Sequence, residues 1–151
     1  MKAVVQRVKE CSVRTEGKLT GEIGPGILIF LGVHEQDSEA DASYLSDKCS
    51  ALRIFEDAAG KMNLSVNDTG GSALVVSQFT LFADTRSGNR PNFMRAAKPQ
   101  IAERLYNYFV ACLEQSLGKE KVATGIFREM MDVELVNDGP VTIIIDTREH
   151  D

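Results

Sequence analysis

Histidine is scarce in this chain of 151 residues, which contains only His34 and His150. His150 is the penultimate residue, and chain termini are usually mobile, so a Ser–His–Asp triad would have to use His34. We interpret His34, which follows an apolar run, as a surface histidine at the end of a strand. Because the sequence also has no HxH, HExxH or paired-cysteine spacing, it predicts no metal site.

Cofactor signatures are missing as well. The glycines at Gly24 and Gly26 lack the rest of a dinucleotide-binding fingerprint and fit a turn. No Walker lysine follows a glycine-rich loop. The sequence therefore predicts a protein that works without a cofactor.

Cysteines and long apolar runs are equally few. The three cysteines form an odd number without CxxC spacing, which predicts reduced thiols in a cytoplasmic protein: Cys11, Cys49 and Cys112. The longest apolar run, residues 27–31, is far shorter than the ~20 residues of a membrane span. The first residues lack the apolar stretch of a signal peptide, so we expect no membrane partner.

Positive charge is in the minority, with 17 basic against 22 acidic residues and a net charge of −5. This balance argues against a protein that coats nucleic acid, but it permits one that holds a short single-stranded end. One basic segment, interleaved with Phe93, is either a contact for acceptor-stem phosphates or a solvated loop: Arg86, Arg90, Arg95 and Lys98.

The apolar patterns predict one α+β domain over residues 1–151, with a curved, barrel-like, mainly antiparallel sheet and two main helices. The predicted strands are residues 2–8, 11–15, 18–23, 27–33, 53–55, 61–66, 72–81, 131–136 and 141–146. Glu16 and Gly17 form a predicted hairpin turn, and residues 67–71 form a predicted loop.

The two helices are predicted from period and capping. Residues 38–52 begin at a Ser38 cap, with Asp41 three residues on, and bury one face: Ala42, Leu45, Cys49 and Leu52. The second helix has Pro99 in its first turn and stops at Gly118. Its apolar period runs through Ile101, Leu105, Tyr108, Phe109, Cys112 and Ser116.

A polar segment closes the predicted strand over residues 72–81: Ser77, Gln78, Phe79 and Thr80. On an ideal strand Gln78 and Thr80 share a face while Ser77 points the other way. A site that used both hydroxyls would therefore need the chain to bend, and a bend would free backbone N–H groups for an oxyanion. The alternative is that the hydroxyls only satisfy backbone groups at a strand end.

A second polar segment lies near the C-terminal end: Asn137, Asp138, Gly139 and Pro140. All four residue types are common in turns. The residues alone therefore predict a hairpin turn between residues 131–136 and 141–146.

Together the two segments resemble the signature motifs of the D-aminoacyl-tRNA deacylases, which strip a D-amino acid or a misplaced glycine from the 3′ end of tRNA. Residues 77–81 are similar to the first motif and residues 137–142 to the second. Residues 4–8, 60–64 and 84–91 also look like this family, and the segments follow the family's order over almost the whole chain.

The resemblance implies a cytoplasmic homodimer whose partner is the tRNA 3′ acceptor end. It would hydrolyse the ester of D-aminoacyl-tRNA, and of glycyl-tRNA mischarged on tRNA(Ala). In the family the Gly-Pro bond is cis and reaches into the active site of the partner subunit, where its carbonyl groups accept from the substrate ammonium and its backbone leaves no room for an L side chain.

Site residues follow from the resemblance too. The implied catalytic segment is Ser77, Gln78, Phe79 and Thr80, and the implied substrate-binding residues are Asn137, Gly139, Pro140, Arg7 and Phe127. Arg7 either braces the Gly-Pro turn or is an ordinary surface arginine. Phe79 and Phe127 either pack against the terminal adenosine or belong to the core.

Three questions stay open at this stage. Thr80 without a histidine is a poor nucleophile, which makes the 2′-hydroxyl of the substrate the better candidate for activating water. Rival functions are a nucleic-acid-binding module with vestigial chemistry and a general small-ester hydrolase. Relatives usually carry small residues where this chain has Arg128 and Glu129, which puts the local shape of the adenosine pocket in question. They commonly have serine where this chain has Asn92, a difference that we expect to touch only the loop.

Overall fold

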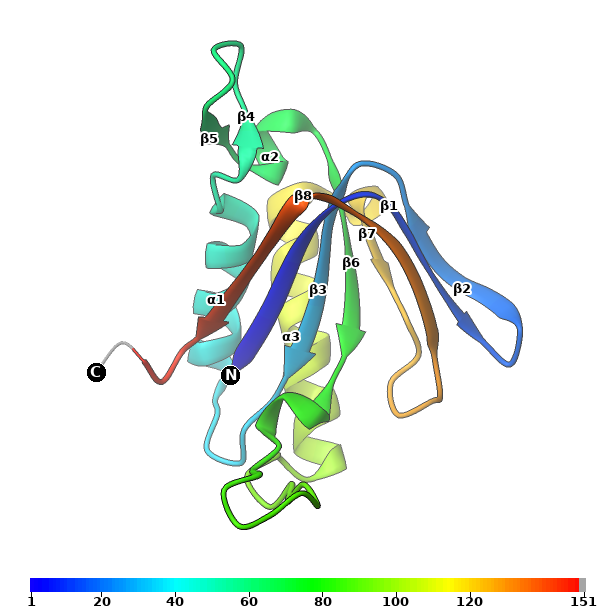
Figure 1. Ribbon diagram of the computed structural model, residues 1–151, viewed down its shortest axis with the longest axis vertical. Coiled ribbons are helices and arrows are strands. Elements are labelled where there is room, and N and C mark those ends of the chain that lie inside the picture. Colours follow the sequence, from blue (N-terminus) through cyan, green and yellow to red (C-terminus); the bar gives the residue numbers. More distant parts are fainter. Residues whose placement is uncertain (150–151) are drawn as a thin grey trace.

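A strongly curved sheet organises the chain, and two long helices cover one of its faces (Figure 1). The computed structural model describes residues 1–149. The six strands of the sheet are β1 (Lys2–Thr15), β2 (Lys18–Ile23), β3 (Gly26–Gly32), β6 (Ser72–Ser77), β7 (Val122–Thr124) and β8 (Asp132–Asp146). A separate ribbon pairs β4 (Phe55–Glu56) with β5 (Met62–Leu64).

The helices are α1 (Glu39–Ala51), the one-turn α2 (Val66–Thr69) and α3 (Pro99–Leu117), with short 3₁₀ segments η1 (Phe79–Phe82) and η2 (Lys119–Lys121). Strand order in the sheet is β2-β1-β3-β6-β7, and β8 pairs with β1. The pairings of β1 with β2, β3 and β8 are antiparallel, whereas β3–β6 and β6–β7 are parallel. The predicted α+β class with a curved, mainly antiparallel sheet is confirmed.

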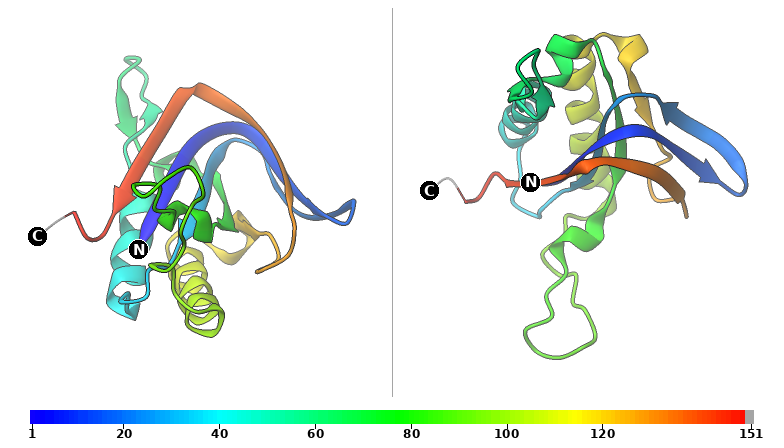
Figure 2. Two further views of the ribbon diagram at one scale, coloured as in Figure 1. Left: turned by 60° about the horizontal axis from the view of Figure 1, so that its bottom comes forward. Right: turned by 45° about the horizontal axis from the view of Figure 1, so that its top comes forward.

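Two strands are much longer than predicted, because β1 and β8 run side by side and bend together (Figure 2). The predicted hairpin turn at Gly139-Pro140 is wrong. Val133 pairs with Val13 and Ile143 with Val5, so both halves of β8 run antiparallel to β1. The polar segment is an interruption of one strand, with register shifts opposite residues 6–10, and such bulges bend a strand pair.

The helices begin where capping predicts. The Ser38 N–H donates to the Asp41 carboxylate at 2.8 Å, Pro99 lies in the first turn of α3, and Gly118 ends that helix. The predicted face of α1 is confirmed, with Ala42, Leu45 and Cys49 fully buried.

The predicted apolar face of α3 is partly wrong. The helix buries Leu105, Tyr106, Phe109 and Leu113, whereas Ile101 and Tyr108 are 40% and 38% exposed. The sheet and α1 cover a narrower stripe of α3 than its apolar residues span.

Two clusters of apolar side chains form the core, one on each face of the sheet. Strand alternation sends Ile29 and Val75 toward the helices, where they pack with Phe109. Leu28 and Leu74 point to the other face, where the curled halves of β1, β2 and β8 enclose them. Each fully buried side chain of this size contributes about 1.5–3 kcal/mol.

Some smaller predictions fail locally. The predicted loop at residues 67–71 begins as α2, because Ser65 and Asp68 form a reciprocal cap and Val66 is buried. All three cysteines have free thiols, and burial raises the pKa of Cys11 and Cys49 to about 12. Within residues 1–149, no helix is long and apolar enough to cross a membrane. His150 lies outside the described residues.

Candidate active site

Strand β6 ends abruptly at Ser77, and the chain bends into η1. The Gln78 N–H still donates to the Leu31 carbonyl at 2.8 Å, which anchors the bend to the end of β3. The predicted strand therefore stops four residues early, and the chain leaves strand geometry where a site that used both hydroxyls would need it to bend.

Gly32 makes room for this bend. A Cβ at this position would lie 3.1 Å from the Gln78 carbonyl oxygen, the Leu81 Cβ and a ring carbon of Phe82. The close approach explains why β3 ends in a residue without a side chain.

Within residues 1–149, the bend leaves two backbone N–H groups, those of Phe79 and Thr80, without a partner, while the next donors along the chain are paired. The Leu81 N–H donates to the Gln78 carbonyl at 3.3 Å, and the Ala83 N–H donates to the Thr80 carbonyl at 3.1 Å. The N–H groups of Phe79 and Thr80 find no acceptor anywhere in the described part of the chain. Two successive free donors are the arrangement that stabilises an oxyanion.

Thr80 also carries a hydroxyl, and the partner of that hydroxyl is not a base. The Gln78 side-chain amide donates to the Thr80 Oγ1, and an amide cannot take a proton from that hydroxyl. The contact orients the exposed Thr80 hydroxyl without activating it as a nucleophile.

His34 is buried, so the prediction of a surface histidine is wrong. Its ring lies edge-on to Phe82 at 5.3 Å, and its Nδ1 accepts from the Gln36 N–H at 3.1 Å. Burial, with Arg148 as the next contribution, lowers the pKa of His34 below its ordinary value near 6.5. His34 does not line the pocket described next, so residues 1–149 offer no Ser–His–Asp triad there.

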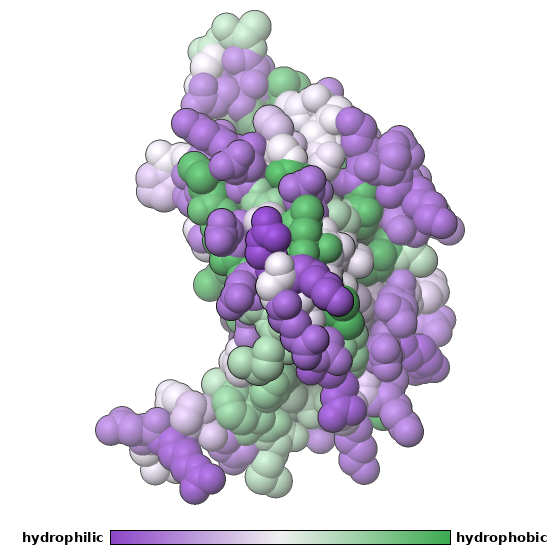
Figure 3. All heavy atoms as spheres, turned by 90° about the vertical axis from the view of Figure 1, so that its right-hand side faces the viewer, coloured by the Kyte–Doolittle hydropathy of each residue, from purple (hydrophilic) through white to green (hydrophobic). Residues whose placement is uncertain are grey.

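A pocket of about 750 Å³ opens beside the bend. The lining of this pocket is mostly apolar. Figure 3 shows apolar side chains gathered in the lower part of the molecular face that the figure displays. The predicted site residues Ser77, Gln78, Phe79, Thr80 and Phe127 all line it. The other lining residues are Leu31, Val33, Val76, Phe93, Ala97, Pro99, Ala102, Arg128, Glu129, Met130, Met131 and Val133.

The aromatic side chains form two walls of this pocket. Phe79 meets Phe93 edge-on at 5.1 Å, and Phe127 lies 5.7 Å from the ring of Tyr106. The Tyr106 hydroxyl donates to the Val75 carbonyl at 2.9 Å, which fixes that wall to the sheet. Phe127 is partly buried, whereas Phe79 is 57% exposed and free to meet a ligand.

The remaining predicted site residues form a second cluster. The Gly139–Pro140 peptide bond is cis, and Gly139 has a φ of +155°, which excludes most other residues. The Asn137 side chain holds the segment closed, because its amide and carbonyl groups both bond the Val141 backbone. Gly139 and Pro140 are exposed and do not line the pocket of their own chain.

Arg7 belongs to this second cluster, and it is only 7% exposed, so the surface interpretation is wrong. Its Nε donates to the Asp138 carbonyl at 2.9 Å, and its Nη1 donates to the Ile54 carbonyl at 2.6 Å. The guanidinium therefore ties the interrupted part of β8 to the segment after α1.

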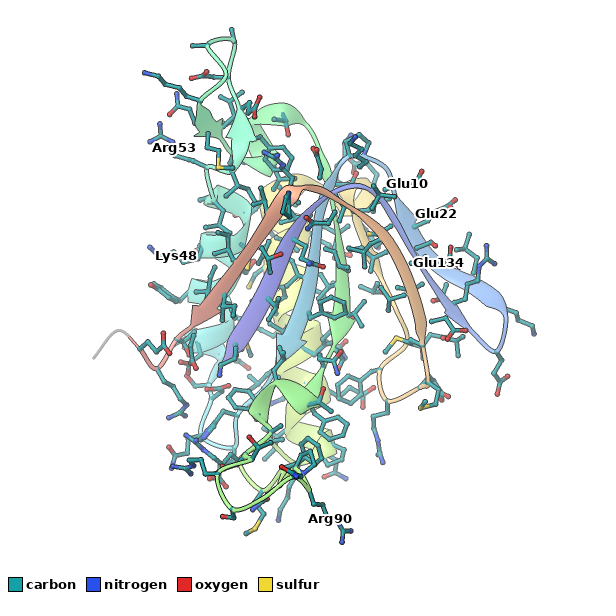
Figure 4. All side chains as sticks on the ribbon, viewed as in Figure 1. Glu10, Glu22, Lys48, Arg53, Arg90 and Glu134 are labelled. Atoms are coloured by element: carbon teal, nitrogen blue, oxygen red, sulfur yellow. The ribbon has the colours of Figure 1, made fainter. Side chains whose placement is uncertain are left out.

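The basic segment is a loop that extends from the end of the molecule, with Arg90 pointing outward (Figure 4). Arg86 pairs with Asp84, and this contact lowers the pKa of the Asp84 carboxyl. A smaller hollow of about 290 Å³ lies elsewhere on the sheet, beside Glu10, Glu22 and Glu134. Its three carboxylates disfavour a nucleic acid there. Residues 1–149 contain no cluster of potential metal ligands.

Sequence reasoning missed several parts of the pocket. Beyond Arg128 and Glu129, which the sequence placed near the adenosine pocket, the loop over residues 125–131 supplies Met130 and Met131, and the start of α3 supplies Pro99 and Ala102. Met130, Met131, Pro99 and Ala102 are not catalytic residue types, and only tertiary folding brings them to β6. The positive φ of Arg128 cannot be read from the residue type.

Comparisons with known proteins agree on one family. The model of the family described as D-Tyr-tRNA(Tyr) deacylase matches residues 4–146. The D-aminoacyl-tRNA deacylase of Syntrophobacter fumaroxidans is 56% identical over 149 residues, with 99% of each chain covered. That of Bacillus velezensis is 54% identical over 149 residues, covering 99% of this chain and all (100%) of the relative.

Solved structures share the fold. The chain described as "c-Myc DNA Unwinding Element Binding Protein" is 40% identical with a TM-score of 0.93, covering 97% of this chain and 99% of that one. A second structure, "Structural Analysis of a probable eukaryotic D-amino acid tRNA deacylase", has a TM-score of 0.83 at 14% identity, with 95% and 97% covered. At that identity the likeness shows the fold alone.

Proposed function

The chain belongs to the D-Tyr-tRNA(Tyr) deacylase family, a family of hydrolases of the aminoacyl-tRNA ester bond, and we propose how its pocket performs that hydrolysis. The terminal adenosine of D-aminoacyl-tRNA enters the pocket beside β6 and packs against Phe79 and Phe127. The ester carbonyl then faces the free N–H groups of Phe79 and Thr80. These two donors carry the proposal, because they are already in place before a substrate binds.

The donors stabilise the tetrahedral intermediate that forms when water attacks the ester. Losing one donor of this kind typically costs about 10²–10³ in rate, so the pair accounts for much of the catalysis. The hydroxyls of Ser77 and Thr80 orient the substrate and the water. With an amide as its partner, Thr80 is not the nucleophile, and the vicinal 2′-hydroxyl of the substrate activates the water.

Chirality is screened by a second copy of the chain. The exposed Gly139-Pro140 segment lies outside the pocket of its own chain, which supports the proposal that it acts on the substrate of the partner subunit in a homodimer. Its carbonyl groups accept from the substrate ammonium, and its backbone occupies the space of an L side chain. Glycine has no side chain to exclude, so glycyl-tRNA is a substrate as well. Arg7 and Asn137 hold this segment rigid.

The partner is the 3′ acceptor end of tRNA, and the place of action is the cytoplasm. A net charge of −5 suits a protein that contacts a few phosphates of one strand end. Arg90 points outward from the loop after η1 (Figure 4). The same loop supplies Phe93 to the pocket, so its basic residues are near enough to contact the acceptor stem.

A nucleic-acid-binding module is the second candidate, because one similar solved chain is described as a DNA-unwinding-element binding protein. Hydrolysis assays separate the two. The purified protein should release labelled tyrosine from D-tyrosyl-tRNA and glycine from glycyl-tRNA, and it should spare L-tyrosyl-tRNA. Binding without turnover would favour the module, and rapid cleavage of free amino-acid esters would favour a general esterase.

A further inference from the structure

The loop between β7 and β8 holds an arginine in a conformation that suits glycine. Arg128 has a φ of +68°, and the Glu129 N–H donates to the Ile126 carbonyl at 3.3 Å across the turn. Few residues with a side chain adopt this left-handed conformation, and doing so costs free energy. Residues kept in such conformations are often found at binding sites.

The side chain of Arg128 has no task within the fold. It is exposed, and among residues 1–149 no ion pair or side-chain hydrogen bond holds its guanidinium. It lines the large pocket, where the other charged lining residue is its neighbour Glu129. A free guanidinium at the edge of a pocket can donate two parallel N–H hydrogen bonds to two oxygens of one phosphate group.

We propose that Arg128 binds the 5′-phosphate group of the terminal nucleotide. This inference rests on the proposed function, because it places adenosine in the pocket with its ester at Phe79 and Thr80. The phosphate is attached to the same ribose and keeps its charge at the solvent-exposed rim, since burial of an unpaired anion is costly. Arg128 is the cation that lines that pocket.

Titration calorimetry with adenosine and with 5′-AMP tests the contact without requiring hydrolysis. The wild-type protein should bind AMP more tightly than adenosine, and Arg128→Gln should weaken AMP binding roughly three- to tenfold while leaving adenosine unchanged. Arg104→Gln makes the same charge change at an exposed position of α3 outside the pocket, and it should leave both affinities unchanged.

Two results would overturn the proposal: a wild-type protein with no preference for AMP, or an Arg128→Gln variant that weakens adenosine and AMP equally. Failure of the proposed function is a separate outcome, because it appears as lack of D-tyrosyl-tRNA hydrolysis by the wild-type protein. An AMP preference that depends on Arg128 would survive that failure.

Discussion

Replacing Gly32 by alanine should damage the site far more than the fold. The new Cβ would lie 3.1 Å from atoms of Gln78, Leu81 and Phe82, which is closer than most contacts of a Cβ. All three atoms belong to the bend that carries the free N–H groups. Relief of the contact must therefore move the bend away from β3 by a few tenths of an ångström.

The expected sizes follow from this geometry. Overpacking of this kind costs about 1–3 kcal/mol, and each kcal/mol lowers the Tm by roughly 2–4 °C in a chain of this length. Catalysis is more sensitive, because a misplacement approaching 1 Å can cost about 10²-fold. We expect kcat/KM for D-tyrosyl-tRNA to fall about 10- to 100-fold while the variant remains folded at 25 °C.

The matched control is Gly24→Ala, since no atom lies within 4 Å of the Cβ that it adds. Its kcat/KM and thermal unfolding should equal those of the wild-type protein. Hydrolysis of D-tyrosyl-tRNA and thermal melts of the three proteins make the comparison. Wild-type activity in Gly32→Ala would refute the view that the position of the bend sets the catalytic geometry.

Three further predictions test other parts of the account. Arg7→Lys should lower the free energy of unfolding by about 1–3 kcal/mol, because one ammonium cannot reach both the Asp138 and Ile54 carbonyl groups. Urea unfolding measures the loss. An unchanged unfolding midpoint would contradict the view that Arg7 holds the Gly139-Pro140 segment in place. Thr80→Ala should keep kcat within about tenfold of the wild-type value. A substrate tRNA ending in 2′-deoxyadenosine should instead be cleaved about 10²–10⁴ times more slowly by the wild-type protein. An inactive Thr80→Ala variant together with a deoxy substrate that is still cleaved would make Thr80 the nucleophile. His34→Gln should flatten the pH dependence of stability. Because burial lowers the pKa of His34, the stabilisation that His34 contributes is fully present above about pH 6.5 and is lost as the pH falls from that value toward the pKa of the folded state. The Tm of the wild-type protein should therefore fall more than that of the variant between about pH 7.5 and 5.5.

Local signals in the sequence were enough to predict most elements of the fold. Ser38 with Asp41 marks the start of α1, and Pro99 and Gly118 bound α3, because capping depends on neighbouring residues. The bend after Ser77 was predicted only on the condition that one site uses both hydroxyls, since hydroxyls on opposite faces of a strand cannot serve one site. Neither inference required knowledge of distant parts of the chain.

Features that depend on distant contacts could not be predicted. The segment at Gly139 reads as a hairpin because its residues form turns, yet pairing with the whole of β1 makes it an interruption in one strand. Burial of His34 and Arg7 likewise depends on Phe82 and Ile54, which lie far away in sequence. The role of Arg128 at the pocket depends on its φ, which residue type does not determine.

A subunit complementation assay tests the shared site most directly. One chain carries Phe79→Pro, which removes a proposed donor at the first position of η1, where proline is tolerated. The other carries Gly139→Ala, whose Cβ would lie 2.5 Å from the Val141 nitrogen at a φ of +155°. Each homodimer should be nearly inactive on D-tyrosyl-tRNA. The heterodimer, purified through two different tags, should recover about half of the wild-type activity, because one of its two sites combines an intact pocket with an intact partner segment. A heterodimer as inactive as the two homodimers would contradict the account, since it would mean that each chain uses its own Gly139-Pro140 segment.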